Sequence, residues 1–164
     1  MKSIIAAILA IGLSATAALA LEAPSGPVVL TVTGKISNTN AGDAAQFDMA
    51  MLEKLKGRKG EMETPWTTGR VTFEGPLLRE ILAAVGATGT NLKVRALNDY
   101  AADVPAEDAK LDTILATKID GKPMSIRDKG PLMLVYPFDL NEDLFNEKYF
   151  SRSVWQIKEI EVGQ

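Results

Sequence analysis

The sequence predicts an α+β protein with a mixed, mostly antiparallel sheet and two or three short helices. Several short segments alternate apolar and polar residues with a period of two, which is typical of strands with one buried face. Two other segments carry apolar residues at helical spacing and are followed by glycines. The dipeptide Asp120-Gly121, between two strand-like segments, indicates a β-hairpin. A chain with many short strands and few helices belongs to the α+β class.

The first twenty residues are expected to be a secretory signal peptide that is cleaved after Ala20. Lys2 precedes an apolar stretch from Ile4 to Leu13, and small residues follow it. This stretch is shorter than the roughly 20 apolar residues that a membrane-spanning helix needs. We therefore expect a single domain over residues 21–164, in a protein that is periplasmic or secreted and has no stable membrane span once the signal is removed.

The first elements of this domain are expected to be a strand and a short helix. Residues 28–36, VVLTVTGKI, alternate inward apolar and outward polar positions, so they predict a strand with one wet face. Residues 47–57, FDMAMLEKLKG, predict a short helix with Asp48 as its N-cap and Gly57 as its end.

The clearest helix follows a second strand, RVTFEG, at residues 70–75. Pro76 is expected in the first turn of this helix, where its missing N–H costs little, and Gly86 is expected to end it. One face is an apolar stripe that consists of Leu77, Leu78, Ile81, Leu82 and Val85.

The second half is expected to consist mainly of strands. Residues 92–96 alternate, and residues 99–109 predict an extended turn in which Pro105 opens a short helical turn. Two strands are expected around the Asp120-Gly121 hairpin, and residues 131–137, PLMLVYP, predict a buried strand.

The last strand, SVWQIKEIEV, contains a break in phase. Trp155 and Ile157 share one parity, whereas Ile160 and Val162 share the other. A β-bulge near Lys158-Glu159 would place both pairs on the same face of the sheet.

The composition excludes several kinds of site. The chain contains neither cysteine nor histidine, which rules out Ser-His-Asp and Cys-His nucleophiles and Cys/His zinc sites. The net charge of −3 leaves no basic excess to neutralise phosphates, so nucleic acid is not an expected partner. Any chemistry would depend on carboxylates, Tyr, Lys, Arg or a cofactor.

Three loops contain candidate binding residues, and each also has an ordinary structural interpretation. Trp66, among threonines, could form a pocket wall or cover the core. Tyr100 could donate a hydrogen bond to a ligand or pack in an ordinary turn. Arg127 and Lys129, before Gly130, could bind an anion with the help of backbone N–H groups, or form a solvent-exposed turn.

Five motifs, in their order and spacing, resemble the molybdopterin-binding domain of sulfite-oxidase-like enzymes. The resemblance covers roughly residues 29–162 and is strongest to small exported single-domain members. The motifs are FEGPLLREILAAVG at residues 73–86, Tyr100 with Val104, Pro105 and Ala109, DGKPM at 120–124, RDKGPLMLVYP at 127–137, and SRSVWQIKEIEV at 151–162. The resemblance implies a sulfite-oxidase-like molybdopterin-binding fold.

The sequence departs from the family at the metal site. Family enzymes bind molybdenum through a cysteine on the loop that here corresponds to about residues 63–68, and this loop contains no cysteine. Without thiolate the usual metal site cannot form. A histidine common in the family is replaced by Lys129, and a lysine before a tryptophan in the last strand is absent. By resemblance, Tyr100 matches an active-site tyrosine, and Arg127 and Lys129 match a cluster of cofactor-anchoring residues.

We therefore expect a non-catalytic binding protein whose family cofactor cleft holds a small anionic ligand or another exported protein. The expected lining is Trp66 as an apolar wall, Tyr100 as a hydrogen-bond donor, and Arg127, Lys129 and Arg152 as cations. No metal ligand and no catalytic residue is assigned, and whether molybdopterin is bound stays open. The alternatives are a molybdopterin-dependent oxidoreductase with non-thiolate metal ligands and an accessory subunit of a membrane sensor or redox system.

Overall fold

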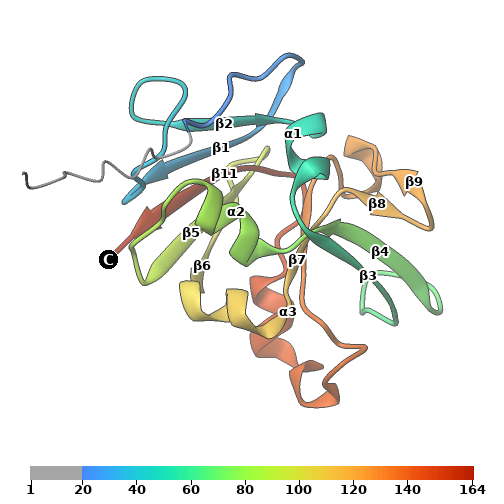
Figure 1. The fold of residues 1–164 in the computed structure, drawn as a ribbon. Helices are drawn as coiled ribbons and strands as arrows, with labels where there is room; N and C mark the ends of the chain where they lie inside the picture. The colour runs from blue at the N-terminus through green and yellow to red at the C-terminus, as the bar shows by residue number, and fades with distance from the viewer. Residues whose placement is uncertain (1–19) are drawn as a thin grey trace, which may run out of the picture.

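The computed structural model describes residues 20–164, so the expected signal peptide, apart from Ala20, lies outside the described residues. Within the described part, no helix is long and apolar enough to cross a membrane. In residues 20–164, eleven strands and three short α-helices surround one hydrophobic core (Figure 1). This arrangement confirms the predicted α+β class.

The larger sheet has the strand order β2-β1-β11-β5-β6. Its central pair, β1 and β11, is parallel, whereas the other neighbours are antiparallel, so the sheet is mixed and mostly antiparallel as predicted. The strands are β1 (Val28–Gly34), β2 (Ala45–Asp48), β5 (Asn91–Ala96), β6 (Ala101–Pro105) and β11 (Ile157–Gly163).

Two smaller sheets complete the β structure. One has the order β3-β4-β8-β9 and lies to the right in Figure 1; the other is the pair β10-β7. Both are antiparallel throughout. Their strands are β3 (Gly57–Met62), β4 (Val71–Pro76), β7 (Ile114–Ala116), β8 (Lys118–Ile119), β9 (Lys122–Pro123) and β10 (Met133–Val135).

Short helices join these sheets. The α-helices are α1 (Met49–Lys54), α2 (Leu78–Ala84) and α3 (Glu147–Arg152), and the 3₁₀ turns are η1 (Ala106–Leu111), η2 (Ile126–Asp128) and η3 (Glu142–Leu144). The turn η1 directly follows Pro105, as the sequence predicted.

The N-cap of α1 is Asp48, as predicted. One carboxylate oxygen accepts from Met51 N at 2.8 Å, and the other accepts from Ser25 N and Gly26 N at 2.8 Å each. These hydrogen bonds lower the pKa of Asp48 to about 2, and the bond from Met51 N contributes most. One side chain therefore starts the helix and fixes the chain that leads into β1.

The break in phase in the last strand is a β-bulge, as predicted. The pairing of β11 with β5 shifts register between Ile157 and Glu159. As a result Ile157, Ile160 and Val162 are all buried, although their sequence parity differs. Trp155 precedes the strand and is exposed at its edge.

The boundaries of both predicted helices need correction. Helix α1 ends at Lys54, and Gly57 begins β3 instead of ending the helix. Pro76 is the last residue of β4, and Leu77 is the N-cap of α2. Gly86 follows the helix with φ +61°, which agrees with its predicted role at the helix end.

Three segments form strands where none was expected. Residues 45–48, just before α1, form β2 by antiparallel pairing with β1. Residues 101–105, expected as an extended turn, form β6 through backbone pairing with β5. Strand β3, GRKGEM, pairs along its whole length with β4 although it shows no apolar alternation. A Cβ at Gly57 would lie 2.4 Å from the Gly75 carbonyl oxygen, so the close approach of these strands requires glycine there.

Candidate functional site

An aromatic pocket of about 330 Å³ lies where the predicted residues Trp66 and Tyr100 meet. The β3–β4 loop, the turn between β5 and β6, helix α3 and the segment before β11 all contribute to it. We call it the aromatic pocket; its lining is Trp66, Ala96, Asn98, Tyr100, Phe150, Ser151, Ser153, Val154 and Trp155.

Trp66 forms the centre of the aromatic wall. Its ring makes edge-on contacts with Phe150 and with Trp155, each with 5.8 Å between ring centroids. Its loop is held by Thr64, which is buried and whose hydroxyl lies 2.9 Å from that of Thr67 and accepts from Trp66 N. The loop that, by the resemblance, corresponds to the cysteine loop of family enzymes carries an indole here, and hydroxyl hydrogen bonds fix it.

Tyr100 lies at the rim, on the turn that joins β5 to β6. The turn is closed by hydrogen bonds from Ala96 N to Tyr100 O and from Asp99 N to Ala96 O. Lys158 Nζ lies 2.6 Å from Asp99 Oδ1, which lowers the pKa of Asp99, and this pair fixes the turn to β11. The exposed Tyr100 side chain reaches toward α3, where its hydroxyl donates to Ser151 O at 3.5 Å.

Arg152 lies on α3, but it is not among the residues that line the aromatic pocket. Its Nη1 donates to Asp108 Oδ2 at 2.9 Å, and Tyr136 Oη donates to the same oxygen at 2.6 Å. Burial, together with the Asp108 carboxylate, raises the pKa of Tyr136, so the phenol keeps its proton and remains a donor. This network fixes α3 against η1 and thereby positions Phe150 and Ser151 in the pocket wall.

Arg127 and Lys129 also lie outside the lining of the aromatic pocket. They sit on the η2 turn, where Arg127 is exposed and Lys129 partly exposed. The Lys129 carbonyl accepts from Gln156 N at 2.9 Å, so this turn adjoins the residue that follows Trp155. Of the five predicted site residues, the fold thus brings together Trp66 and Tyr100.

The sequence offered little signal for the other lining residues. The shared parity of Trp155 and Ile157 predicts that Trp155 belongs to the last strand. In the structure Trp155 lies before β11, at the pocket rim. Phe150 comes from a helix that the sequence did not predict. The one sequence feature that points to these lining residues is the aromatic-rich stretch YFSRSVW at residues 149–155.

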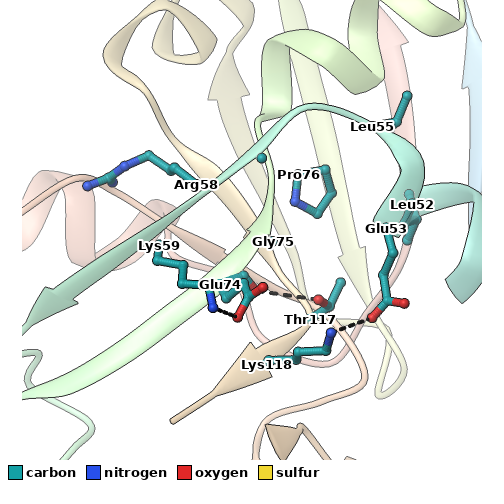
Figure 2. A pocket seen from close by; sticks show the side chains of 11 residues that line it. Leu52, Glu53, Leu55, Arg58, Lys59, Glu74, Gly75, Pro76, Thr117 and Lys118 are labelled. Atoms are coloured by element: carbon teal, nitrogen blue, oxygen red, sulfur yellow. Dashed lines mark hydrogen bonds and ion pairs between the residues drawn. The ribbon is translucent and has the colours of Figure 1, made fainter. Parts of the chain in front are cut away.

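A larger hollow of about 560 Å³, which we call the polar pocket, lies between α1, β3, β4 and β8 (Figure 2). Four of its five charged side chains pair with one another: Lys59 with Glu74 at 3.0 Å, and Lys118 with Glu53 at 2.9 Å. The hydrogen bond to Glu53 raises the pKa of Lys118. Arg58 points away from the other labelled side chains in Figure 2 and pairs with Asp139.

The molybdenum cofactor implied by the resemblance does not fit the aromatic pocket as a complete group. Because the chain has no cysteine, it offers no thiolate to the metal. Among residues 20–164, no cluster of three His, Cys, Asp or Glu side chains could hold a metal ion. The lining contains no Lys or Arg to hold a phosphate, although its rings suit a planar heterocycle.

Comparisons with known proteins agree with this fold. The sulfane dehydrogenase SoxCD from Paracoccus pantotrophus has a similar structure, with a TM-score of 0.60 and 17% sequence identity over 82% of this chain. The match spans 37% of the SoxCD chain, so this protein covers little more than a third of its length. No curated protein sequence matches the chain. The family model for the oxidoreductase molybdopterin binding domain matches residues 44–163. The chain therefore belongs to the oxidoreductase molybdopterin-binding domain family, with a sulfite-oxidase-like fold.

Proposed function

We propose that this protein is an exported, non-catalytic member of its family, which binds a small planar ligand of the pterin class without molybdenum. The observation that carries the proposal is the aromatic pocket, where four aromatic side chains from separate segments converge: Trp66, Tyr100, Phe150 and Trp155. Indole and phenyl rings bind flat heterocycles through their faces and edges. The volume of about 330 Å³ lies at the lower end of small-molecule sites.

Polar groups at the same pocket suit a heterocycle that both donates and accepts hydrogen bonds. Ser151 and Ser153 donate their hydroxyl protons to backbone carbonyls, which leaves the hydroxyl oxygens as acceptors. The side-chain oxygen of Asn98 accepts from Tyr100 N, so the side-chain N–H groups of Asn98 can donate hydrogen bonds to a ligand. A few polar groups in an apolar pocket are what orient a small ligand.

In this protein the aromatic pocket would bind a pterin ring without the molybdenum that the family name implies. The description of the family includes molybdopterin, and the aromatic pocket suits the pterin ring. The chain has no cysteine to bind molybdenum, which supports a binding role over an oxidoreductase role. Arg127 and Lys129 lie outside this lining, so any anion that they hold would lie outside the aromatic pocket.

Export is the second part of the proposal. It rests on the order of Lys2, the apolar stretch and the small residues up to Ala20. N-terminal sequencing of the protein recovered from the periplasm or the medium should begin at Leu21. A chain that still begins at Met1 in the cytoplasm would contradict export.

The function is tested first on protein purified from its own compartment. We expect oxidised pterin fluorescence in the denatured extract and no molybdenum by elemental analysis. Stoichiometric molybdenum would overturn the proposal in favour of an oxidoreductase with non-thiolate metal ligands. If the protein is isolated without pterin, titration with neopterin should quench its tryptophan fluorescence, and failure of both tests would contradict the proposal.

Variants then assign the ligand to the aromatic pocket. Trp66→Leu should weaken neopterin binding about tenfold or more, because stacking on an indole contributes strongly to ring binding. The matched control is Lys59→Ala in the polar pocket, which should bind neopterin as the unaltered protein does. Equal loss in both variants would show that the ligand does not occupy the aromatic pocket.

A further inference from the structure

A third hollow, of about 770 Å³, lies next to the aromatic pocket and is more apolar than the polar pocket. It runs between the start of β1, the start of β11 and the turn from Met124 to Pro131. We call it the apolar groove; its main apolar walls are Val28, Leu97, Ile126 and Pro131, over Ile157.

The apolar groove carries exposed side chains that would gain from being covered. Ile126 is 57% exposed, Val28 44% and Leu97 42%. Tyr100 and Trp155, at the neighbouring aromatic pocket, are also exposed. These five belong to the seven large apolar residues that are exposed in residues 20–164, and all five lie at these two hollows or beside them. Exposed apolar side chains that gather at adjoining hollows indicate an interaction surface.

The η2 turn beside the groove carries two cations and one acid, so its formal charge is +1. Arg127 and Lys129 follow Ile126 on the η2 turn, and the ion pairs within the described chain include neither of them. The neighbouring acids have hydrogen-bond or ion-pair partners, although a serine hydroxyl leaves the negative charge of Asp128 in place. Asp128 accepts from the Ser125 hydroxyl, and Glu159 lies near Arg95 and Thr33. Lys158, on the groove wall, is neutralised by Asp99.

The wall that carries these cations is held in place before any partner arrives. Ser125 caps the turn, and Gly130 N donates to Ser125 O at 2.7 Å. Gln156 binds the turn from the other side, since its side-chain amide donates to Ile126 O and its backbone N donates to Lys129 O. A wall fixed in this way loses little conformational entropy on binding.

We propose that the apolar groove docks a segment of a partner protein in which acidic residues flank apolar ones. The apolar side chains of the segment cover Val28, Leu97 and Ile126, and its carboxylates pair with Arg127 and Lys129. Burial of apolar surface supplies the affinity, and charge complementarity selects acidic segments over basic ones. This site is separate from the ring site proposed for the aromatic pocket, although the Leu97–Tyr100 turn borders both.

The test is selection of a phage-displayed library of random peptides against the full protein as the cell processes it. We expect the enriched peptides to share apolar residues flanked by Asp or Glu. A synthetic peptide of that consensus should bind in fluorescence polarisation, with an affinity that falls as salt rises.

Variants locate the peptide. Ile126→Asp should weaken binding about tenfold or more, because it places a carboxylate in the apolar contact and beside those of the peptide. The pair Arg127→Gln and Lys129→Gln should weaken binding severalfold and flatten the salt dependence. The control Leu140→Asp changes a residue that is 61% exposed outside the groove and should leave binding unchanged. All variants should melt at the temperature of the unaltered protein.

Several outcomes would overturn the proposal. The first is that the library enriches no peptide, and the second is that the consensus contains no acidic residue. The third is that the peptide binds the Ile126→Asp variant as tightly as the unaltered protein. Self-association of the protein that Ile126→Asp abolishes would instead make the groove a contact between two copies. Binding to vesicles of phosphatidylglycerol that the same variant abolishes would make it a membrane contact. Trp66→Leu should reduce neopterin binding and spare the peptide, so the two proposals fail separately.

Discussion

The polar pocket and the aromatic pocket differ in how far their chemical groups already satisfy one another. The polar pocket is the larger, at about 560 Å³ against about 330 Å³, yet its lysines and glutamates pair across it (Figure 2). The aromatic pocket contains no charged side chain and presents ring faces and free amide N–H groups to solvent. Polar groups that already pair with one another gain little from a ligand. Among the described residues, the polar pocket keeps one unsatisfied group, Arg58 Nη1, which is buried without a hydrogen-bond partner. The pairing of its lysines and glutamates is the reason that we place the proposed ligand in the aromatic pocket.

The two pockets also differ in how their helical walls are fixed. The aromatic pocket depends on α3, which the buried Arg152–Asp108–Tyr136 network fixes from behind. The polar pocket depends on α1, which Asp48 caps at its start. Changes in these two anchors should therefore affect one pocket at a time.

The largest effect is expected from Asp108→Ala. The change leaves the Arg152 guanidinium and the Tyr136 hydroxyl without their shared acceptor in a largely buried place. We expect a loss of about 3 kcal/mol in the free energy of unfolding, measured by urea denaturation. Asp103→Ala, at an exposed pair with Lys93, should change it by less than about 1 kcal/mol. Equal, small losses in both variants would show that the network does not hold α3.

Trp66→Leu should affect ligand binding more than stability. The ring is partly exposed and contacts two other aromatic rings. A loss of about tenfold in neopterin affinity corresponds to about 1.4 kcal/mol of binding free energy. Fluorescence of added neopterin, followed in polarisation, measures this without relying on the altered tryptophan. Unchanged affinity would remove Trp66 from the site.

Asp48→Ala should lower the melting temperature by a few degrees, because it removes the cap of α1 and the acceptor for Ser25 N and Gly26 N. The hydrogen bonds lower the pKa of this carboxyl from 3.8 to about 2 in the folded protein. Its contribution is therefore complete above about pH 4 and is lost as the pH falls toward 2. Melting curves of both proteins should converge over that range, and neopterin binding at pH 7 should be unaffected.

The smallest effect is expected from Lys59→Ala in the polar pocket. The Lys59 side chain is mostly exposed and pairs with Glu74 at the surface. We expect a change below about 0.5 kcal/mol in the free energy of unfolding, and it should disappear in high salt. A ligand whose binding fell in this variant would overturn the contrast between the two pockets.

Much of the fold could be predicted because its signals are local. Alternation identified β1 and β5, and the apolar stripe and Gly86 identified α2. Asp120-Gly121 identified the hairpin between β8 and β9, and the break in parity identified the bulge in β11. Each of these features depends on neighbours within a few residues, so the sequence reports it directly.

Strands without such a pattern required the tertiary structure. Strand β3 forms where Gly57 allows it to lie close to Gly75 of β4, and strand β6 forms by backbone hydrogen bonding to β5. The candidate site divides in the same way. Trp66 and Tyr100 were identified by residue type on loops, and the fold brings them together. The partner of Arg152 was not predictable, because Asp108 lies far away in the sequence.

By itself, the sequence determined the fold class and the absence of thiolate and imidazole, since composition and periodicity do not depend on long-range contacts. It also determined the family, through the resemblance of five motifs in their order and spacing. Only the tertiary structure decided where the cations lie. It directs Arg152 to a buried acid and places Arg127 and Lys129 on a turn beside the apolar groove. The physical reason is that the environment of a charged side chain is set by segments distant in sequence, which meet only when the sheets close around the core.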